Sequence, residues 1–210
     1  MNLTDIRNVY CIGRNYALHI EELGNQRPQE PLVFSKPTHA LVHTSGQAIP
    51  LPGKQGSLHY EAEVVIQVAR PYKEGIEITT AIDAIALGID MTLRDVQSKL
   101  KSAGQPWLRA KGFRNSAIIS NRLPLPPSDE LLNTSFSLRK NGKLAQEGKL
   151  KEMIFSLPDI LSYCQTHFGL DKGDLIYTGT PAGVGELDDG DHLQLFWGKD
   201  MLGECTIKLD

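Results

Sequence analysis

Two acidic residues lie two positions apart in an otherwise apolar segment, HYEAEVVIQV, residues 59–68. The even-numbered residues from Ala62 to Val68 are all apolar, an alternation that predicts a half-buried strand. Because successive strand side chains point to opposite faces, Glu61 and Glu63 lie on one face, about 7 Å apart. Two interpretations stay open: a solvated outer face, or a site where a cation relieves the repulsion between the carboxylates.

A second group of polar residues occurs in GIDMTLRDVQ, residues 88–97. Asp90 lies near the end of an apolar strand, just before a predicted helix for which Thr92 fits the N-cap. Arg94 and Gln97 are three positions apart on that helix and share a face. Each residue also has an ordinary interpretation, in which Asp90 caps the turn and Arg94 pairs with a surface acid.

A third group could supply acid-base chemistry. In GRNYALHIEELG, His19 and Glu22 are three positions apart on a short predicted helix, where a carboxylate can orient an imidazole and favour its role as a base. The alternative is a surface helix with a chance histidine. The segment YTGTPAGVG, residues 177–185, is glycine-rich and predicts a loop whose backbone approaches another group closely. It lacks the GK[ST] of a phosphate-binding loop and could be a simple turn.

The elements that must position these residues are many short strands and a few helices. Strands are predicted at residues 8–13, 31–36, 61–70, 84–92, 134–148 (a hairpin), 173–181 and 191–209, and helices at 15–24, 93–103 and 156–169. Asn141-Gly142 is typical of a type I′ hairpin turn, and Ser156 and Gly169 are typical of a helix start and stop. Since strands and helices do not alternate regularly, we expect a strand-rich α+β fold rather than a doubly wound parallel sheet.

Composition narrows the class of protein. With 210 residues and 40% hydrophobic residues, the chain is long enough for one substantial core. A net charge of −3 without a dense Lys/Arg block argues against nucleic acid or an anionic membrane as partner. The N-terminal sequence has no apolar signal region, and no apolar stretch is long enough to span a membrane. Cys11, Cys164 and Cys205 are widely spaced, which indicates reduced, buried thiols in a cytoplasmic protein.

The order of these motifs resembles the fumarylacetoacetate hydrolase family. The motifs are GRNY with H-x-x-E, FSKP, H-Y-E-x-E, D-M-T-x-R-D-V-Q, a lysine in RAKGF, and TGTP-x-GVG, from about Val9 to the C-terminus. The chain is most similar to the small acylpyruvase and oxaloacetate-handling members. The resemblance implies a mixed β-sandwich roll with few helices, a single catalytic domain over residues 1–210 without the extra N-terminal domain of larger members, and a homodimer.

The resemblance also implies roles for individual residues. The metal ligands would be Glu61, Glu63 and Asp90. The catalytic residues would be His19 and Glu22, on a segment that closes over the substrate, and Lys111. The substrate-binding residues would be Arg94, Gln97 and Thr180. Three carboxylates without a Cys/His cluster favour Mg²⁺ or Mn²⁺ over zinc. His59 shares the strand face of the acids, and we expect it to support the ligands rather than bind the ion.

The expected substrate is a small anionic 2-keto acid, because a bound ion reverses the negative charge of the acidic site. The leading hypothesis is hydrolysis of the C–C bond of acylpyruvates through a pyruvate enolate stabilised by the ion, with His19 and Glu22 activating water. The alternative uses the same site for oxaloacetate decarboxylation or keto–enol tautomerisation. A non-catalytic sensor is a third possibility, against which the complete His19–Glu22 pair argues, because binding alone needs no general base.

Overall fold

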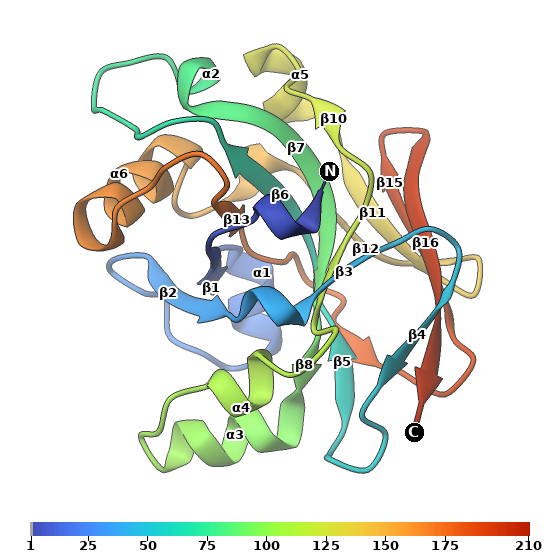
Figure 1. Cartoon of the computed structure of the whole chain (residues 1–210). Coiled ribbons are helices and arrows are strands. Elements are labelled where there is room, and N and C mark those ends of the chain that lie inside the picture. The colour runs from blue at the N-terminus through green and yellow to red at the C-terminus, as the bar shows by residue number, and fades with distance from the viewer. Residues whose placement is uncertain (1) are drawn as a thin grey trace.

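Two large β-sheets and a smaller one make up most of the molecule (Figure 1). The computed structural model describes residues 2–210, so Met1, where the predicted domain begins, lies outside the described residues. The first sheet has eight strands. In spatial order they are β2 (Leu32–Lys36), β1 (Val9–Gly13), β13 (Leu175–Tyr177), β6 (Ala62–Val68), β7 (Ile82–Asp90), β9 (Ala117–Ile119) and β3 (Leu41–His43), with β10 (Leu123–Pro124) beside β7.

The C-terminal half supplies most of the second large sheet. Its order is β12 (Lys143–Gly148), β11 (Phe136–Lys140), β15 (His192–Trp197), β16 (Asp200–Leu209) and β4 (Ala48–Leu51). The third sheet contains β14 (Gly185–Glu186), β5 (Leu58–Tyr60) and β8 (Thr92–Leu93). It joins β5, which precedes the strand that carries Glu63, to β8, which precedes the helix that begins at Arg94.

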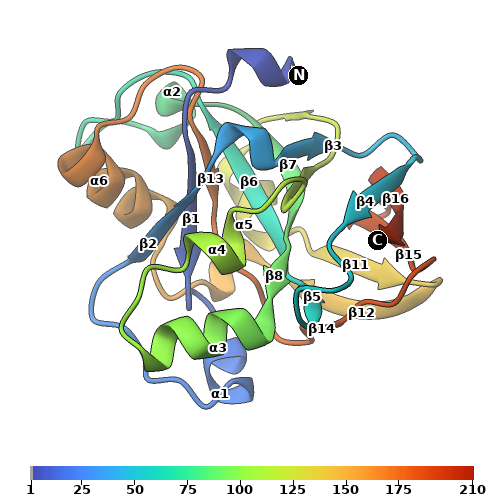
Figure 2. The ribbon, with the colours of Figure 1, turned by 60° about the horizontal axis from the view of Figure 1, so that its bottom comes forward.

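Short helices surround the sheets. They are α1 (Ala17–Glu22), α2 (Ile78–Ala81), α3 (Arg94–Ser102), α4 (Leu108–Lys111), α5 (Ser128–Asn133) and α6 (Leu157–Phe168), with 3₁₀ turns at Leu3–Asp5, Thr38–Ala40 and Leu150–Glu152. At one end of the molecule, α3 lies near the segment that follows α1, because Lys101 of α3 donates to Asn25 there (Figure 2). The strand-rich α+β prediction is therefore confirmed. Within residues 2–210, none of the helices has the length and apolar character that crossing a membrane requires.

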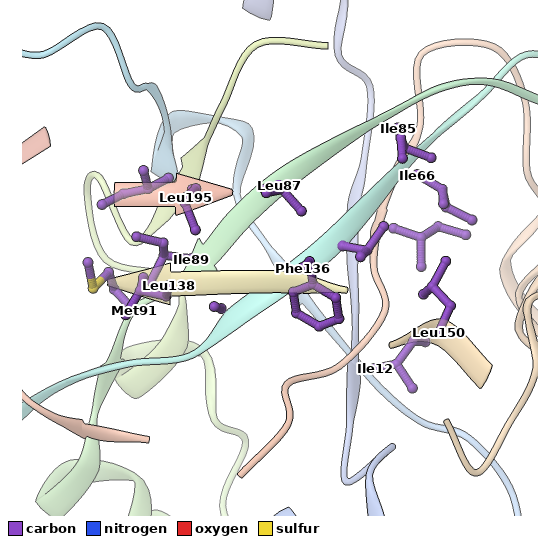
Figure 3. Packing of buried hydrophobic residues seen from close by; sticks show 14 of the residues in the cluster. Ile12, Ile66, Ile85, Leu87, Ile89, Met91, Phe136, Leu138, Leu150 and Leu195 are labelled. Carbon is purple, nitrogen blue, oxygen red and sulfur yellow. The ribbon is translucent and has the colours of Figure 1, made fainter. Parts of the chain in front are cut away.

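The main core fills the space between the two large sheets (Figure 3). Side chains of β6 and β7 face those of β11 and β15, and the labelled examples are Ile66, Ile85, Leu87, Ile89, Phe136, Leu138 and Leu195. All seven are almost fully buried. Burial of each such side chain stabilises the fold by about 1.5–3 kcal/mol, so this contact is what holds the sheet carrying the acids against the second sheet.

Strand β6 is buried on both faces, not on one as predicted. Val64 and Ile66 pack in the core between the sheets, whereas Val65 packs in a second cluster that includes Ile6 and Ala40. The N-terminal segment and the turn at Thr38–Ala40 thus cover the face that alternation alone left open to solvent. Glu61 and Glu63 are themselves only 5% and 2% exposed, so the interpretation of the glutamates as a solvated outer face is wrong.

Several local predictions are confirmed. The predicted hairpin has its turn at Asn141 and Gly142, whose φ angles are 53° and 76°. Ser156 caps the N-terminus of α6, as predicted. The N-cap assigned to Thr92 is wrong. Thr92 pairs with His59 in the third sheet, and α3 begins after Leu93 without a side-chain cap.

The predicted state of the cysteines is also confirmed. Cys11, Cys164 and Cys205 are free and buried. Burial raises the pKa of Cys164 and of Cys205 to about 12, so both thiols are protonated and unreactive in the folded chain.

Candidate active site

Three buried carboxylates meet where β6 and β7 run side by side. Glu61 lies in the break between β5 and β6, Glu63 is on β6, and Asp90 ends β7. One oxygen of each lies within 4.8 Å of the others, and the residues are 5%, 2% and 1% exposed. The Asp90 N–H donates to the Glu61 carbonyl at 2.8 Å, which fixes the two segments relative to each other. The structure therefore brings these three acids together, as the family resemblance implies.

Three cations surround the carboxylates. Lys111, at the end of α4, places Nζ 2.7 Å from Glu61 Oε2 and 2.6 Å from Asp90 Oδ2. Arg94, the first residue of α3, pairs with the other Glu61 oxygen. Lys36, at the end of β2, lies 2.7 Å from Asp90 Oδ1. With all six groups ionised, their charges cancel.

This compensation is uneven between the acids. Burial alone would raise the pKa of Glu61, but Lys111 and Arg94 outweigh it and lower that pKa. For Glu63, burial followed by the charges of Asp90 and Glu61 raises the pKa well above its ordinary value. The Gly179 N–H donates to Glu63 at 2.7 Å, yet among residues 2–210 no cation forms an ion pair with it.

A divalent cation would supply the missing compensation. The donor set consists of carboxylate oxygens, which are the ligands that Mg²⁺ and Mn²⁺ prefer. The residues present therefore fit such an ion. His59, considered above as a supporting residue, does not line this cavity. Its Nε2 lies 3.0 Å from Ser57 Oγ.

The predicted acid-base pair lies over the same cavity. His19 is buried on α1, and its Nδ1 lies 3.4 Å from Glu22 Oε2. Burial lowers the pKa of His19, more than the nearby Glu61 and Glu22 charges raise it. The imidazole is therefore neutral at pH 7, and the Glu22 contact assigns the proton to Nδ1 and the lone pair to Nε2.

The glycine-rich loop holds both groups through its backbone. Gly179 donates to Glu63, and the Gly183 N–H donates to both oxygens of Glu22, at 3.1 and 3.3 Å. Gly183 has a φ of 97°, and a Cβ at this position would overlap the carbonyl oxygen of Ala145. The prediction that this backbone approaches another group closely is confirmed, and the reason glycine is needed is steric.

Eight of the nine predicted site residues line one cavity. They are His19, Glu61, Glu63, Asp90, Arg94, Gln97, Lys111 and Thr180. The ninth, Glu22, lies behind His19 and contacts it instead. On α3, Arg94 donates to Gln97 at 2.7 Å, as expected for residues that share a helix face. The ordinary interpretation of Arg94 as a surface ion-pair partner is wrong, because its acidic partner is the buried Glu61.

Lys36 and Gln146 are among the residues of this site that sequence reasoning missed. Lys36 lies in the quoted FSKP motif, and besides Asp90 it donates to the carbonyls of Met91 and Ser116 at 3.2 and 3.0 Å. A lysine ending an apolar strand was the available signal. Gln146, on the hairpin, accepts from the Ala62 N–H at 2.8 Å and donates to Thr180 Oγ1 at 2.8 Å. Nothing in the local sequence distinguishes it from an exposed glutamine.

Comparison with known proteins identifies this arrangement. The family profile described as "Fumarylacetoacetate (FAA) hydrolase C-terminal" matches residues 8–209. The chain belongs to the fumarylacetoacetate hydrolase family. Members of this family with similar sequences include the oxaloacetate tautomerase YcgM of Escherichia coli, strain K12, which is 39% identical over 191 residues, covering 90% of this chain and 87% of that protein. The mitochondrial oxaloacetate tautomerase FAHD1 of Bos taurus is 38% identical over 191 residues, covering 90% and 86%.

Solved structures of the fumarylacetoacetate hydrolase family share the fold. The fumarylpyruvate hydrolase of Pseudomonas aeruginosa, crystallised with Mn²⁺ and pyruvate, superposes with a TM-score of 0.87. It is 32% identical, and the match covers 98% of this chain and 91% of that one. This chain is accordingly an enzyme of a family whose members include both oxaloacetate tautomerases and a hydrolase.

Proposed function

We propose that this protein is a divalent-metal-dependent oxaloacetate tautomerase, which interconverts the keto and enol forms of oxaloacetate. This was the alternative hypothesis from the sequence. Two relatives with 38–39% identity carry that name, which supports it over acylpyruvate hydrolysis. The observation that carries the proposal is the charge balance at the acidic centre, where three cations oppose the carboxylates of Glu61, Glu63 and Asp90 before any ion binds.

In this proposal Glu61, Glu63 and Asp90 hold one Mg²⁺ or Mn²⁺. The ion acts as a Lewis acid that stabilises negative charge on neighbouring substrate oxygens. Because the charges of these six groups cancel when all are ionised, a bound ion would add two positive charges at the acidic centre. Oxaloacetate is a dianion at neutral pH, and this added positive charge favours its binding.

Proton transfer is assigned to His19. Its neutral Nε2 takes a proton from C3 of the keto acid, while the Glu22 carboxylate stabilises the imidazolium that forms. The imidazolium returns the proton to the C2 oxygen to complete the conversion, or to C3 to reverse it. Lys111 donates to Glu61, Asp90 and Thr92, so it contributes a fixed positive charge rather than a mobile proton.

A second candidate is hydrolysis of acylpyruvates, which was the leading hypothesis from the sequence. The fumarylpyruvate hydrolase with 32% identity supports it, and the same imidazole could deprotonate a water molecule. Oxaloacetate decarboxylation would use the same cavity. We propose in either case a single catalytic domain over residues 1–210 that works as a homodimer, in a reducing compartment such as the cytoplasm, where its free thiols persist.

The test compares three activities on one preparation of the protein. After dialysis against EDTA and addition of Mg²⁺ or Mn²⁺, we would follow decay of the oxaloacetate enol absorbance, pyruvate release from oxaloacetate, and loss of acetylpyruvate. We expect enol decay to have the highest kcat/KM and to disappear in His19→Ala. A higher kcat/KM for acetylpyruvate would establish the hydrolase instead, and faster pyruvate release would establish the decarboxylase. Full activity in excess EDTA would refute the metal requirement.

A further inference from the structure

Two cations of the cavity have no acidic partner. Arg14 and Lys101 line the same cavity as the carboxylates. Among residues 2–210 neither forms an ion pair, whereas Arg94 and Lys111 both pair with Glu61. The positive charges of Arg14 and Lys101 are therefore available to a ligand.

The position of Lys101 follows from the geometry of α3. Arg94, Gln97 and Lys101 occupy positions i, i+3 and i+7, which form one stripe along a helix, and all three line the cavity. Seven residues advance about 10 Å along the axis. Arg94 lies at the carboxylates and Gln97 is buried, while Lys101 is exposed, so the stripe runs from the acidic centre to the mouth.

The two cations approach from different elements. Arg14 follows β1 and has a φ of 58°, which is uncommon for a residue other than glycine. Lys101 Nζ donates to Asn25 Oδ1 at 2.9 Å, in the turn after α1, and Asn25 lines the cavity as well. This bond holds the ammonium group near the segment that carries His19.

The electrostatic effect on Lys101 agrees with this placement. Partial burial lowers the pKa of Lys101, and the positive charges of Arg14 and Arg94 lower it further. Arg94 is paired with Glu61, whereas within residues 2–210 Arg14 and Lys101 form no ion pair, and their like charges repel each other. An anion bound between them would relieve that repulsion.

We propose that Arg14 and Lys101 bind the second carboxylate of a dicarboxylic keto acid, and so make this enzyme select dianions over monoanions. The assignment rests on the proposed function, because it takes the keto acid end of the substrate to lie at Glu61, Glu63 and Asp90. It predicts that oxaloacetate is preferred over pyruvate-like ligands with an uncharged end. Acylpyruvates would be accepted better when their acyl group ends in a carboxylate.

The test measures binding rather than turnover. Malate and lactate share a 2-hydroxy acid group and differ in the second carboxylate, and neither undergoes keto–enol conversion. We would titrate both into the Mn²⁺-loaded protein by calorimetry. Wild type should bind malate at least tenfold more tightly than lactate, and Arg14→Gln/Lys101→Gln should bring the two Kd values within about twofold while leaving the lactate Kd unchanged.

The matched control is Lys99→Gln/Arg109→Gln. It removes the same charge from α3 and α4 at exposed positions that do not line the cavity, and it should keep the malate preference. A preference that survives in the Arg14/Lys101 variant would overturn the proposal, as would its loss in the control. A wild type without preference would overturn it too.

Turnover of oxaloacetate by wild type separates this proposal from the proposed function. If wild type does not act on oxaloacetate but the double variant has lost the malate preference of wild type, the tautomerase proposal is refuted and the subsite proposal stands. An active wild type whose malate preference survives in the double variant would refute only the subsite.

Discussion

At the scale of single residues, the site depends on buried charges whose partners come from distant parts of the chain. Asp90 is 1% exposed and contacts two lysines, Lys36 and Lys111. A buried ion pair gains little over an apolar pair, but loss of one partner leaves an uncompensated charge. The stability of the acidic centre therefore depends on cations that β2 and α4 supply.

Lys36→Met tests this dependence. Its side chain is fully buried, and it donates to two backbone carbonyls besides pairing with Asp90. We expect the free energy of unfolding to fall by about 3–5 kcal/mol. Urea denaturation would measure this, with Lys54→Met as an exposed control that should change stability by less than about 0.5 kcal/mol. Equal stability of both variants would contradict the expectation.

The pH dependence of kcat/KM tests the role of His19. Burial lowers the pKa of this imidazole below its ordinary value of 6.5. A base must be neutral, so activity should be constant above that pKa and fall as the pH drops through it, below 6.5. Because Glu22 raises the pKa of His19, Glu22→Gln should shift this acid limb to still lower pH. An acid limb above pH 6.5 would exclude His19 as the group that titrates.

At the scale of elements, the glycine-rich loop connects the acidic centre to α1. It donates one backbone N–H to Glu63 and another to Glu22, and the hairpin residue Gln146 donates to its Thr180. Three elements that are far apart in sequence thus fix the distance between the proposed metal ligands and the proposed base.

Gly183→Ala should separate this function of the loop from its contribution to folding. The substitution adds a Cβ that overlaps the Ala145 carbonyl, which displaces the N–H that holds Glu22. We expect at least a tenfold loss of kcat. The control is Gly190→Ala, which has a similar φ of 85° with open space around the Cβ and should cost only about 1 kcal/mol of stability. Similar kcat values in both variants would show that the Glu22 contact is dispensable.

At the scale of the whole molecule, metal binding should stabilise the fold. A ligand at 100 times its Kd adds about 2.7 kcal/mol when it binds only the folded state. We expect Mn²⁺ to raise the Tm of wild type and to have little effect on Glu63→Gln, which removes one of the three carboxylates. Equal Tm shifts in the two proteins would place the ion elsewhere.

The proposed homodimer is a separate prediction. Light scattering at micromolar concentration should give a mass near twice that of the 23.2 kDa chain. A single species of 23.2 kDa would reject the dimer while leaving the site in one chain unaffected, because the predicted residues all come from one chain.

The sequence by itself determined the features that follow from local geometry. Strand alternation placed Glu61 and Glu63 together, and helix periodicity paired His19 with Glu22 and Arg94 with Gln97. Turn and capping chemistry located the hairpin and α6. In each case the physical cause acts over a few residues, so it can be predicted without knowing the fold.

Only the tertiary structure decided what surrounds those residues. It buried both faces of β6, where alternation predicted one, because a second apolar cluster packs on the other face. It also brought Lys36 to Asp90, which is 54 positions away in the chain, and Gln146 to Ala62, which is 84 positions away. Such pairings depend on strand order and on how the sheets pack, and residues that meet only after folding carry no periodic signal in the sequence.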